Sequence, residues 1–314
     1  MTPSSDSLPG PWLAGVTVLE RGWLSSNNVV LHGAPDEGAT LVDTGHSVHA
    51  AQTLALVATA LRGERLAQIV NTHLHSDHCG GNAALAGARG ATLRSAARQA
   101  DAVAQWDMTR LTYRSTGQRC DRFGHDATLQ PGARLTVGAR TWEVLGAPGH
   151  DPDSLLLFDA RDGVLISADA LWHNGFGVVF PELDGVAAFD DVAAVLDLIG
   201  TLDARIVIPG HGAPFTDVGG ALRRARQRLS KFVANPLLHA RHAAKVLVKY
   251  HLMEERQQAL DALLDWADDT ALLHRTLRRA GIDDDVRTAC RALLAELVAT
   301  GAARIDDRQV VHDA

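Results

Sequence analysis

Short apolar runs alternate with turn-forming segments in the first part of the chain. Three such runs lie at residues 16–19, 28–31 and 39–42. The segments between them are rich in Ser, Asn, Pro, Asp and Gly, so the pattern predicts a β meander. Asp43 follows the third run and is expected at the tip of a buried strand. Residues 48–62 then show helical spacing of apolar side chains and stop near Gly63.

Apolar runs of strand length recur as far as residue 209. They lie at residues 66–70, 134–137, 141–145, 155–158, 164–167 and 205–209. An amphipathic helix is expected at 189–202, and the Ala-rich stretch 83–104 is expected to be mostly helical around a short strand. Residues 105–134 show little periodicity, which predicts a long surface excursion. Two groups of strands with helices between them predict two packed sheets with helices outside.

Beyond about Val218 the apolar spacing is helical. The expected helices lie at residues 218–232, 240–253, 259–267, 272–280 and 286–300. Residues 301–311 have the pattern of a small hairpin, and helices followed by a hairpin resemble a winged-helix module. We therefore expect two domains, one at residues 1–218 and a helical, winged-helix-like one at residues 219–314.

Composition places the chain among ordinary globular proteins. Of its 314 residues, 46% are hydrophobic and 21% are charged, and such a length can bury a large core. The first residues lack a basic start followed by an apolar core, so no signal peptide is expected. No apolar run approaches the ~20 residues that a membrane helix needs. The three widely spaced cysteines predict no disulfide framework and a reducing cytoplasm.

Charge is unevenly spread along the chain. The net charge is -7 at pH 7, yet residues 219–314 hold 16 basic and 13 acidic side chains. Domains that bind nucleic acid are usually strongly basic. The weak surplus in the tail does not favour nucleic acid as a partner. We expect a small-molecule substrate instead, no membrane contact, and a homodimer as one possible assembly.

The densest candidate chemistry lies in residues 72–81, directly after an apolar run. This stretch holds His73, His75, Asp77 and His78, followed by Cys79 and two glycines. Residues two apart in extended backbone point the same way, so His73 and His75 can reach one ion together. Asp77 and His78 lie on the turn beyond and suit a second ion.

Four further residues of the same chemical types each follow an expected strand. They are Asp43, His150, Asp169 and His211. Glycines beside His150 and His211 let the backbone come close to an ion without a clashing side chain. Repeated placement of His and Asp at strand ends is expected to gather them on one rim of the two sheets.

The order of these residues resembles the metallo-β-lactamase superfamily, in its glyoxalase II-like and β-lactamase-like-2 branch. The resemblance covers residues 12–215 and includes all five family motifs. It implies an α+β fold, an αββα metallo-β-lactamase sandwich, for a catalytic domain at residues 1–218. The tail resembles the winged-helix tail of β-lactamase-like-2 proteins more weakly.

The resemblance also implies a ligand assignment. His73, His75 and His150 would hold one metal, Asp77, His78 and His211 would hold a second, and Asp169 would bridge both. Asp43 would lie behind the ligands and orient one of them or the turn. Imidazoles and carboxylates suit two divalent ions, zinc first, with iron or manganese as alternatives.

Such a pair of metals implies hydrolysis. A hydroxide held between the metals would attack a carbonyl or phosphoryl centre, because coordination lowers the pKa of water toward ~7. Asp77 could both hold its metal and accept a proton, and Asp169 would be the other catalytic carboxylate. We therefore expect a metal-dependent hydrolase of an ester, thioester or lactone.

Several residues near the motifs have two interpretations. Cys79 follows the last ligand of its stretch and could contact a metal as a thiolate, although a small buried residue under the site is the simpler expectation. The segment after Asp169 could line a substrate pocket or form a packed hydrophobic loop; its candidates are Trp172, His173, Phe176 and Phe180. Tyr250 could reach over the rim from the tail, or lie on an ordinary helix face.

Other functions stay open. The third motif, at residues 149–154, departs from glyoxalase II, and no set of glutathione-binding residues is evident, so a glutathione thioester is in doubt. A phosphodiesterase or ribonuclease, β-lactam hydrolysis and iron-dependent oxygen or sulfur chemistry are alternatives within the fold. A metal-sensing DNA-binding regulator is the non-enzymatic alternative, but the expected recognition helix at 284–300 mixes acidic with basic side chains.

Overall fold

A six-stranded sheet forms the first half of the fold. The computed structural model describes residues 11–314, and its first sheet has the order β1-β2-β3-β4-β5-β6. The strands are β1 (Val16–Leu19), β2 (Asn28–Leu31), β3 (Ala39–Val42), β4 (Leu66–Val70), β5 (Thr92–Ala96) and β6 (Ala127–Leu129). β1 to β3 form the antiparallel meander expected from the sequence, and β3 to β6 run parallel.

A five-stranded sheet packs against the first, with the order β11-β10-β9-β8-β7. Its strands are β7 (Arg134–Val137), β8 (Arg140–Gly146), β9 (Leu155–Asp159), β10 (Val164–Ala168) and β11 (Ile206–Pro209). Only β10 and β11 are parallel in this sheet. Both strands are buried along their whole length. Their aliphatic runs lack alternating polar residues, which is typical of strands covered on both faces.

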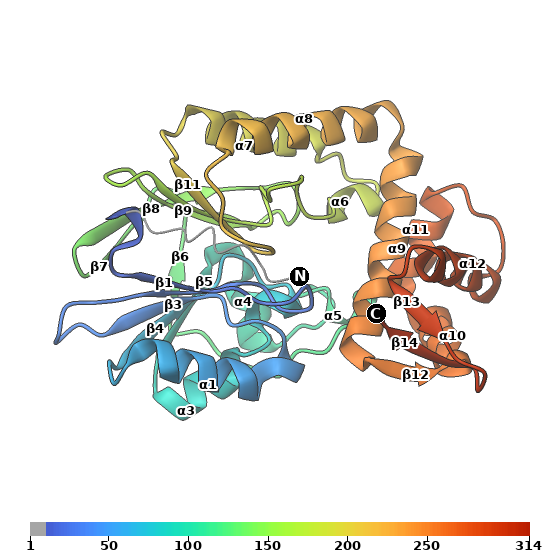
Figure 1. The fold of residues 1–314 in the computed structure, drawn as a ribbon, viewed down its shortest axis with the longest axis horizontal. Coiled ribbons are helices and arrows are strands. Elements are labelled where there is room, and N and C mark those ends of the chain that lie inside the picture. Colours follow the sequence, from blue (N-terminus) through green and yellow to red (C-terminus); the bar gives the residue numbers. More distant parts are fainter. Residues whose placement is uncertain (1–10) are drawn as a thin grey trace, which may run out of the picture.

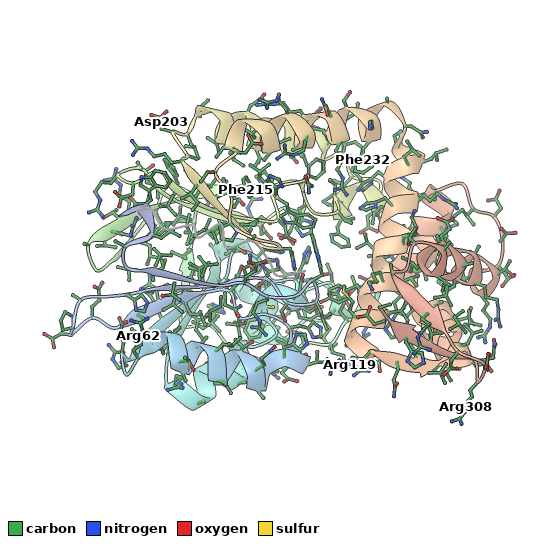
Figure 2. The ribbon with its side chains drawn as sticks, viewed as in Figure 1. Arg62, Arg119, Asp203, Phe215, Phe232 and Arg308 are labelled. Carbon is green, nitrogen blue, oxygen red and sulfur yellow. The ribbon has the colours of Figure 1, made fainter. Side chains whose placement is uncertain are left out.

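Aliphatic side chains from both sheets interdigitate in the space between them, and Figure 2 shows that side chains fill this space. The contributors include Val29, Leu31, Val42 and Val70 from the first sheet and Val144, Leu157, Ile166 and Ile208 from the second. Burying side chains of this kind contributes roughly 1.5–3 kcal/mol each. This core holds the two sheets, and therefore their strand ends, in one position.

Helices cover the outer face of each sheet, as Figure 1 shows. The helices on the first sheet are α1 (Ala50–Leu61), α3 (Asn82–Arg89) and α4 (Ala100–Gln105), and those on the second are α7 (Phe189–Thr201) and α8 (Val218–Ala234). Three short helices lie in the connections: α2 (Ser76–Cys79), α5 (Tyr113–Thr116) and α6 (Phe180–Leu183). The layers form the αββα sandwich that the sequence predicted.

The tail forms helices and a small sheet beside the sandwich (Figure 1). Its elements are α9 (Pro236–Glu255), α10 (Leu260–Asp269), α11 (Ala271–Arg279), α12 (Val286–Ala299), β12 (Gln257–Ala259), β13 (Ala303–Ile305) and β14 (Val310–Asp313). The expected hairpin gains β12 as a third strand in the order β12-β14-β13. Helices α9 to α12 share one apolar core, whereas α8 packs with α7 on the second sheet. A domain boundary after residue 218 and the winged-helix assignment stay predictions.

The expectation of a surface excursion at residues 105–134 is wrong in part. Leu111, Tyr113 and Phe123 are buried in the core under the first sheet. Their irregular spacing gives no helical or strand period, because the segment contributes single anchors from turns and from α5. Within residues 11–314, no helix has the length and apolar character needed to cross a membrane.

Candidate metal centre

The loops that carry the candidate ligands meet at one edge of the sandwich. Parallel pairing of β3 with β4, and of β10 with β11, brings their carboxyl ends to the same edge. Two backbone hydrogen bonds join the sheets there: Asn27 N–H donates to the Gly210 carbonyl at 2.7 Å, and Leu155 N–H donates to the Thr72 carbonyl at 2.9 Å. The irregular register at the end of β10, with Ala168 at φ 45°, turns the chain before Asp169.

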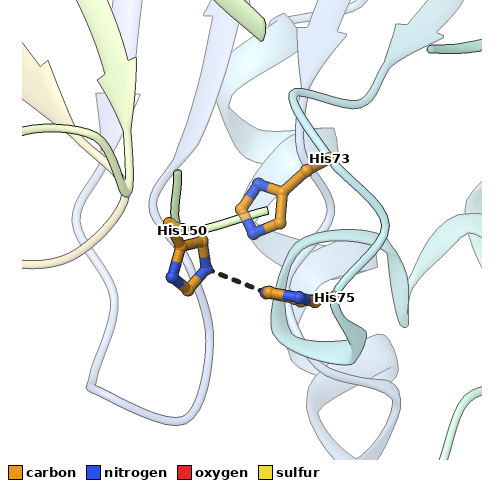
Figure 3. Close-up of side chains that lie close together, drawn as sticks. All are labelled: His73, His75 and His150. Atoms are coloured by element: carbon orange, nitrogen blue, oxygen red, sulfur yellow. Dashed lines mark hydrogen bonds between the residues drawn. The ribbon is translucent and has the colours of Figure 1, made fainter. Parts of the chain in front are cut away.

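His73, His75 and His150 form one ligand-type group, shown in Figure 3. The Nδ1 of His75 lies 2.9 Å from the Nε2 of His150. The Nδ1–H of His150 donates to the Val178 carbonyl at 2.6 Å. That hydrogen bond leaves the Nε2 lone pair directed at the group, which is how metal-binding imidazoles are usually oriented.

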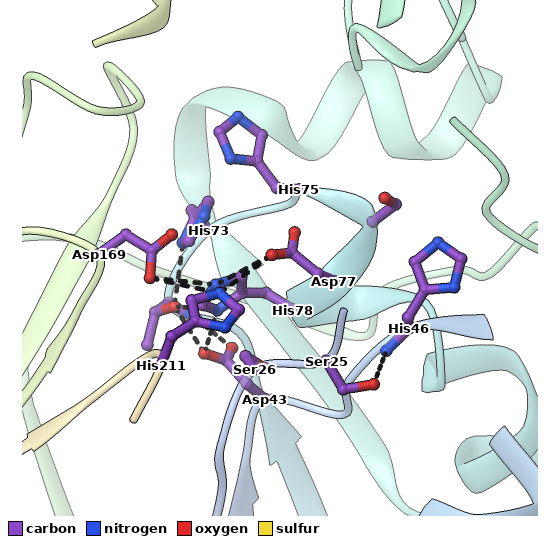
Figure 4. A network of polar contacts seen from close by, with 12 residues as sticks. Ser25, Ser26, Asp43, His46, His73, His75, Asp77, His78, Asp169 and His211 are labelled. Atoms are coloured by element: carbon purple, nitrogen blue, oxygen red, sulfur yellow. Dashed lines mark hydrogen bonds and ion pairs between the residues drawn. The ribbon is translucent and has the colours of Figure 1, made fainter. Parts of the chain in front are cut away.

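Asp77, His78, Asp169 and His211 form a second, buried group beside the first (Figure 4). Asp77 Oδ2 lies 3.1 Å from His211 Nε2, and Asp169 Oδ1 lies 3.4 Å from His78 Nε2. The other oxygen of Asp169, Oδ2, lies 3.3 Å from His150 Nε2 in the three-histidine group. Asp169 thus lies between the two groups, as expected for a carboxylate that would bridge two metals.

The chemistry of these groups fits metal ions better than a network of hydrogen bonds. Three buried ring nitrogens of these two groups have no hydrogen-bond partner among the described residues: His73 Nε2, His78 Nε2 and His211 Nδ1. Burial lowers the pKa of His73 well below its usual value and lowers those of His75 and His150 to about 4. The neutral imidazoles of His73, His75 and His150 offer free lone pairs beside buried carboxylates, a donor set that suits zinc, iron or manganese.

Asp43 lies behind the second group and orients one of its members. Its Oδ2 accepts hydrogen bonds from the Nδ1–H of His78 at 2.8 Å and from the Thr72 hydroxyl at 2.7 Å. Its Oδ1 accepts the Thr72 backbone N–H at 2.9 Å. Since the hydrogen bond from Nδ1 fixes that side of the His78 ring at Asp43, the Nε2 of His78 faces Asp169. This contact supports the expected orienting role of Asp43.

Cys79 points away from both groups. Its Sγ lies 3.1 Å from the Tyr113 hydroxyl and 3.8 Å from the Sγ of Cys120, and the residue is fully buried. Cys79 belongs to neither cluster of ligand-type side chains in the described part of the chain. The arrangement supports the interpretation of a small buried residue under the site.

Gly210, next to His211, leaves room that a side chain would fill. A Cβ there would lie 2.2 Å from Asp169 Oδ1 and 3.0 Å from the backbone carbon of Ala168. We therefore expect Gly210→Ala to displace the Asp169 carboxylate and to weaken metal binding about 10–100-fold, the loss typical when a ligand's support is removed. Metal titration against a chromogenic chelator measures this loss.

Gly87→Ala is the matched control for that substitution, because a Cβ at Gly87 in α3 meets nothing within 4 Å. It should keep normal metal affinity and raise stability slightly, by about 0.4–1 kcal/mol. Equal metal affinities of Gly210→Ala and the unaltered chain would show that Asp169 is not held as described.

The two groups lie at the floor of a cavity of about 1300 Å³. The four sequence-predicted pocket residues all line it: Trp172, His173, Phe176 and Phe180. The Trp172 indole N–H donates to Asp169 Oδ1 at 3.1 Å, and the Phe180 ring lies 5.0 Å from that of His75. These contacts support a pocket rather than a merely packed loop.

Two other aromatic residues, Trp23 and Tyr250, lie at the rim of the cavity. Trp23 stacks on His211, with ring centroids 5.5 Å apart and an interplanar angle of 6°. Sequence reasoning missed it, and its only signal is a large aromatic residue within a turn. Tyr250 of α9 does reach over the rim, because its hydroxyl lies 2.7 Å from the Ser76 Oγ. Its neighbour His251 stacks on Trp266 inside the tail instead.

Two sheets between helix layers, with imidazoles and carboxylates gathered at one edge, define a scaffold for metal-dependent hydrolysis. The family model of the metallo-beta-lactamase superfamily matches residues 21–211. The chain is 31% identical to a hydroxyacylglutathione hydrolase of Anaeromyxobacter dehalogenans, over 72% of this chain and 78% of that protein. It therefore belongs to the metallo-β-lactamase superfamily, among its glyoxalase II-like hydrolases.

Further relatives agree with this assignment. A hydroxyacylglutathione hydrolase of Methylococcus capsulatus is 31% identical over 52% of this chain, and the match spans only 55% of that protein's length. A solved beta-lactamase domain protein from Burkholderia ambifaria superimposes with a TM-score of 0.60 and 22% identity, covering 99% of this chain and 97% of that one. At that identity the likeness shows the fold alone.

Proposed function

We propose that this hydrolase uses two divalent metal ions to cleave a small-molecule ester, thioester or lactone. One observation carries the proposal: two ligand-type groups lie side by side, share Asp169 and form the floor of a single cavity. The three-histidine group would hold one ion, and Asp77, His78 and His211 would hold the other. Zinc is the first expectation, and iron or manganese would suit the same donors.

When bound there, the two ions would supply Lewis acidity, which lowers the pKa of water and polarises a carbonyl or phosphoryl oxygen. The chain's own groups would do the rest. Asp77 is a buried carboxylate at the cavity floor and is placed to accept a proton from the attacking water. The indole N–H of Trp172 keeps Asp169 in its orientation through a hydrogen bond of 3.1 Å.

The cavity walls support a substrate with apolar parts. Rings of Trp23, Trp172 and Phe180 surround the ligand groups, and Met253 and Leu297 extend the apolar lining from the tail. Such walls exclude water from a bound acyl group and strengthen electrostatic interactions at the floor. The tail's contribution supports the idea that it shapes the pocket. A homodimer contact through the tail stays a prediction.

Both sequence relatives are hydroxyacylglutathione hydrolases, which supports a thioester before other acyl substrates. The absence of a recognisable glutathione-binding set in the sequence argues for testing other thioesters as well. Phosphodiesters and β-lactams are the alternatives that the same fold can serve.

A substrate panel joined to metal reconstitution tests the proposal. The protein, stripped of metal and reloaded separately with zinc, iron or manganese, is assayed against thioesters, lactones, esters, β-lactams and a phosphodiester. We expect metal-dependent cleavage of at least one thioester, ester or lactone. Turnover confined to the phosphodiester or the β-lactam would contradict the proposed substrate class, and turnover that survives metal removal would contradict the mechanism.

A further inference from the structure

Arg228 of α8 lines the cavity without an acidic partner in the described part of the chain. Its Nη2 donates a hydrogen bond to His242 Nε2 at 2.6 Å, and no carboxylate within residues 11–314 lies in ion-pair distance of it. Two other arginines of the same helix are paired: Arg224 with Asp217 at 3.2 Å, and Arg226 with Asp197 at 2.8 Å. Arg228 is therefore a cation of the cavity lining that has no ion pair among the described residues.

Aromatic rings hold the Arg228 side chain in place. Its guanidinium carbon lies 5.5 Å from the centre of the Phe176 ring and 5.4 Å from that of Phe232. Gly175 allows this packing, because a Cβ there would lie 2.8 Å from Arg228 Nη1. A guanidinium packed over two rings loses little further entropy when it binds a ligand. The group is prepared for an anion before one arrives.

The imidazole beside Arg228 is neutral, and the side-chain carboxylates of the tail that line the cavity, Glu296 and Asp313, are paired with lysines. Burial, with help from Arg228, lowers the pKa of His242 to about 4, so this imidazole is neutral and accepts the hydrogen bond. Lys245 lies almost one turn further along α9 and also lines the cavity. Its partner Glu296, 3.2 Å away, is shared with Arg241. One carboxylate, Glu296, thus faces two basic side chains, Arg241 and Lys245, and leaves Arg228 uncompensated.

We propose that Arg228 is a specificity-determining residue that binds an anionic group, a carboxylate or a phosphate, on the substrate of this hydrolase. The inference rests on the proposed function, since it assigns a role to one part of the wall of the cavity whose floor holds the ligand groups. A guanidinium binds such oxyanions through two parallel hydrogen bonds, and partial burial strengthens them. The substrate would thus be an acyl compound with an apolar body and an anionic terminus.

Matched substrates test this assignment. In the first series the acyl group is constant, and the thiol of the thioester ends in a carboxylate, a phosphate or a neutral amide. In the second series the carboxylate or the amide lies on the acyl chain instead. A hydrogen bond between charged groups predicts a preference of about 10–100-fold in kcat/KM for an anionic substrate over its amide counterpart. The carboxylate and phosphate arms identify the oxyanion.

Variants assign that preference to Arg228. Arg228→Met should raise KM for the anionic substrate, leave kcat nearly unchanged and have little effect on the amide. Arg228→Lys should keep part of the preference because it retains the charge. Arg226→Met, on the same helix but paired with Asp197, should behave like the unaltered chain. A preference that survives Arg228→Met, or equal losses on both substrates, would overturn the proposal.

A binding measurement separates this inference from the hydrolysis itself. Non-cleavable thioether analogues, one anionic and one neutral, are titrated against the full chain and followed by tryptophan fluorescence, because Trp23 and Trp172 line the cavity. Tighter binding of the anionic analogue that is lost in Arg228→Met supports the subsite even if no thioester is cleaved. Equal binding of both analogues by the unaltered chain refutes the subsite even if thioesters are cleaved.

Discussion

Asp169→Ala is expected to abolish turnover and to lower the metal content of the protein. The Asp169 carboxylate lies near nitrogens of both ligand groups, 3.3 Å from His150 and 3.4 Å from His78. Its removal takes an oxygen from both sites and leaves the buried imidazoles without their shared anion. The loss in kcat/KM should exceed about 100-fold, the upper range for a residue that merely supports a ligand.

Asp121→Ala is the control for that variant, because Asp121 is an exposed carboxylate in the loop after α5. It should keep both its metal and its activity. Circular dichroism of the metal-free proteins checks that Asp169→Ala still folds. Normal turnover in Asp169→Ala would rule out the shared-carboxylate mechanism.

Asp43→Asn is expected to weaken metal binding about 10–100-fold although Asp43 touches no ion in this account. Its carboxylate accepts three hydrogen bonds, two from Thr72 and one from the Nδ1–H of His78. An amide would turn one NH₂ group toward these donors, so the His78 ring would rotate or change tautomer. Competition with a chelator measures the affinity, and loss of the second ion before the first is the expected order.

Asp126→Asn provides the comparison. Within residues 11–314, the Asp126 side chain makes a single hydrogen bond, which it accepts from the Leu93 backbone N–H at 2.7 Å. This substitution should leave metal affinity unchanged. If Asp43→Asn binds metal as tightly as Asp126→Asn does, the orienting role of Asp43 is refuted.

The positions of the candidate ligands could be predicted because each depends on local pattern. His73 and His75 alternate directly after an aliphatic run, and Asp169 and His211 each follow another such run. Aliphatic runs form buried strands, and strand ends collect at an edge once the sheets pack. The spacing of residues in the sequence therefore predicted most of the fold and the position of both ligand groups at one edge of the sheets.

Other features depend on contacts that no local pattern records. The stacking of Trp23 on His211 joins residues far apart in the chain, and the contact of Tyr250 with Ser76 requires the packing of α9 against the sandwich. Arg228 has the same spacing as its paired neighbours on α8. Its lack of an acidic partner became visible only when α8, α9 and the loop at Gly175 were placed together.

Metal stoichiometry of the reconstituted protein tests the central claim most directly. Inductively coupled plasma mass spectrometry should find about two divalent ions per chain, one for each ligand group. His211→Ala, which removes a member of the second group only, should reduce the count to about one. No bound metal in the unaltered chain, or the same count in His211→Ala, would contradict the account.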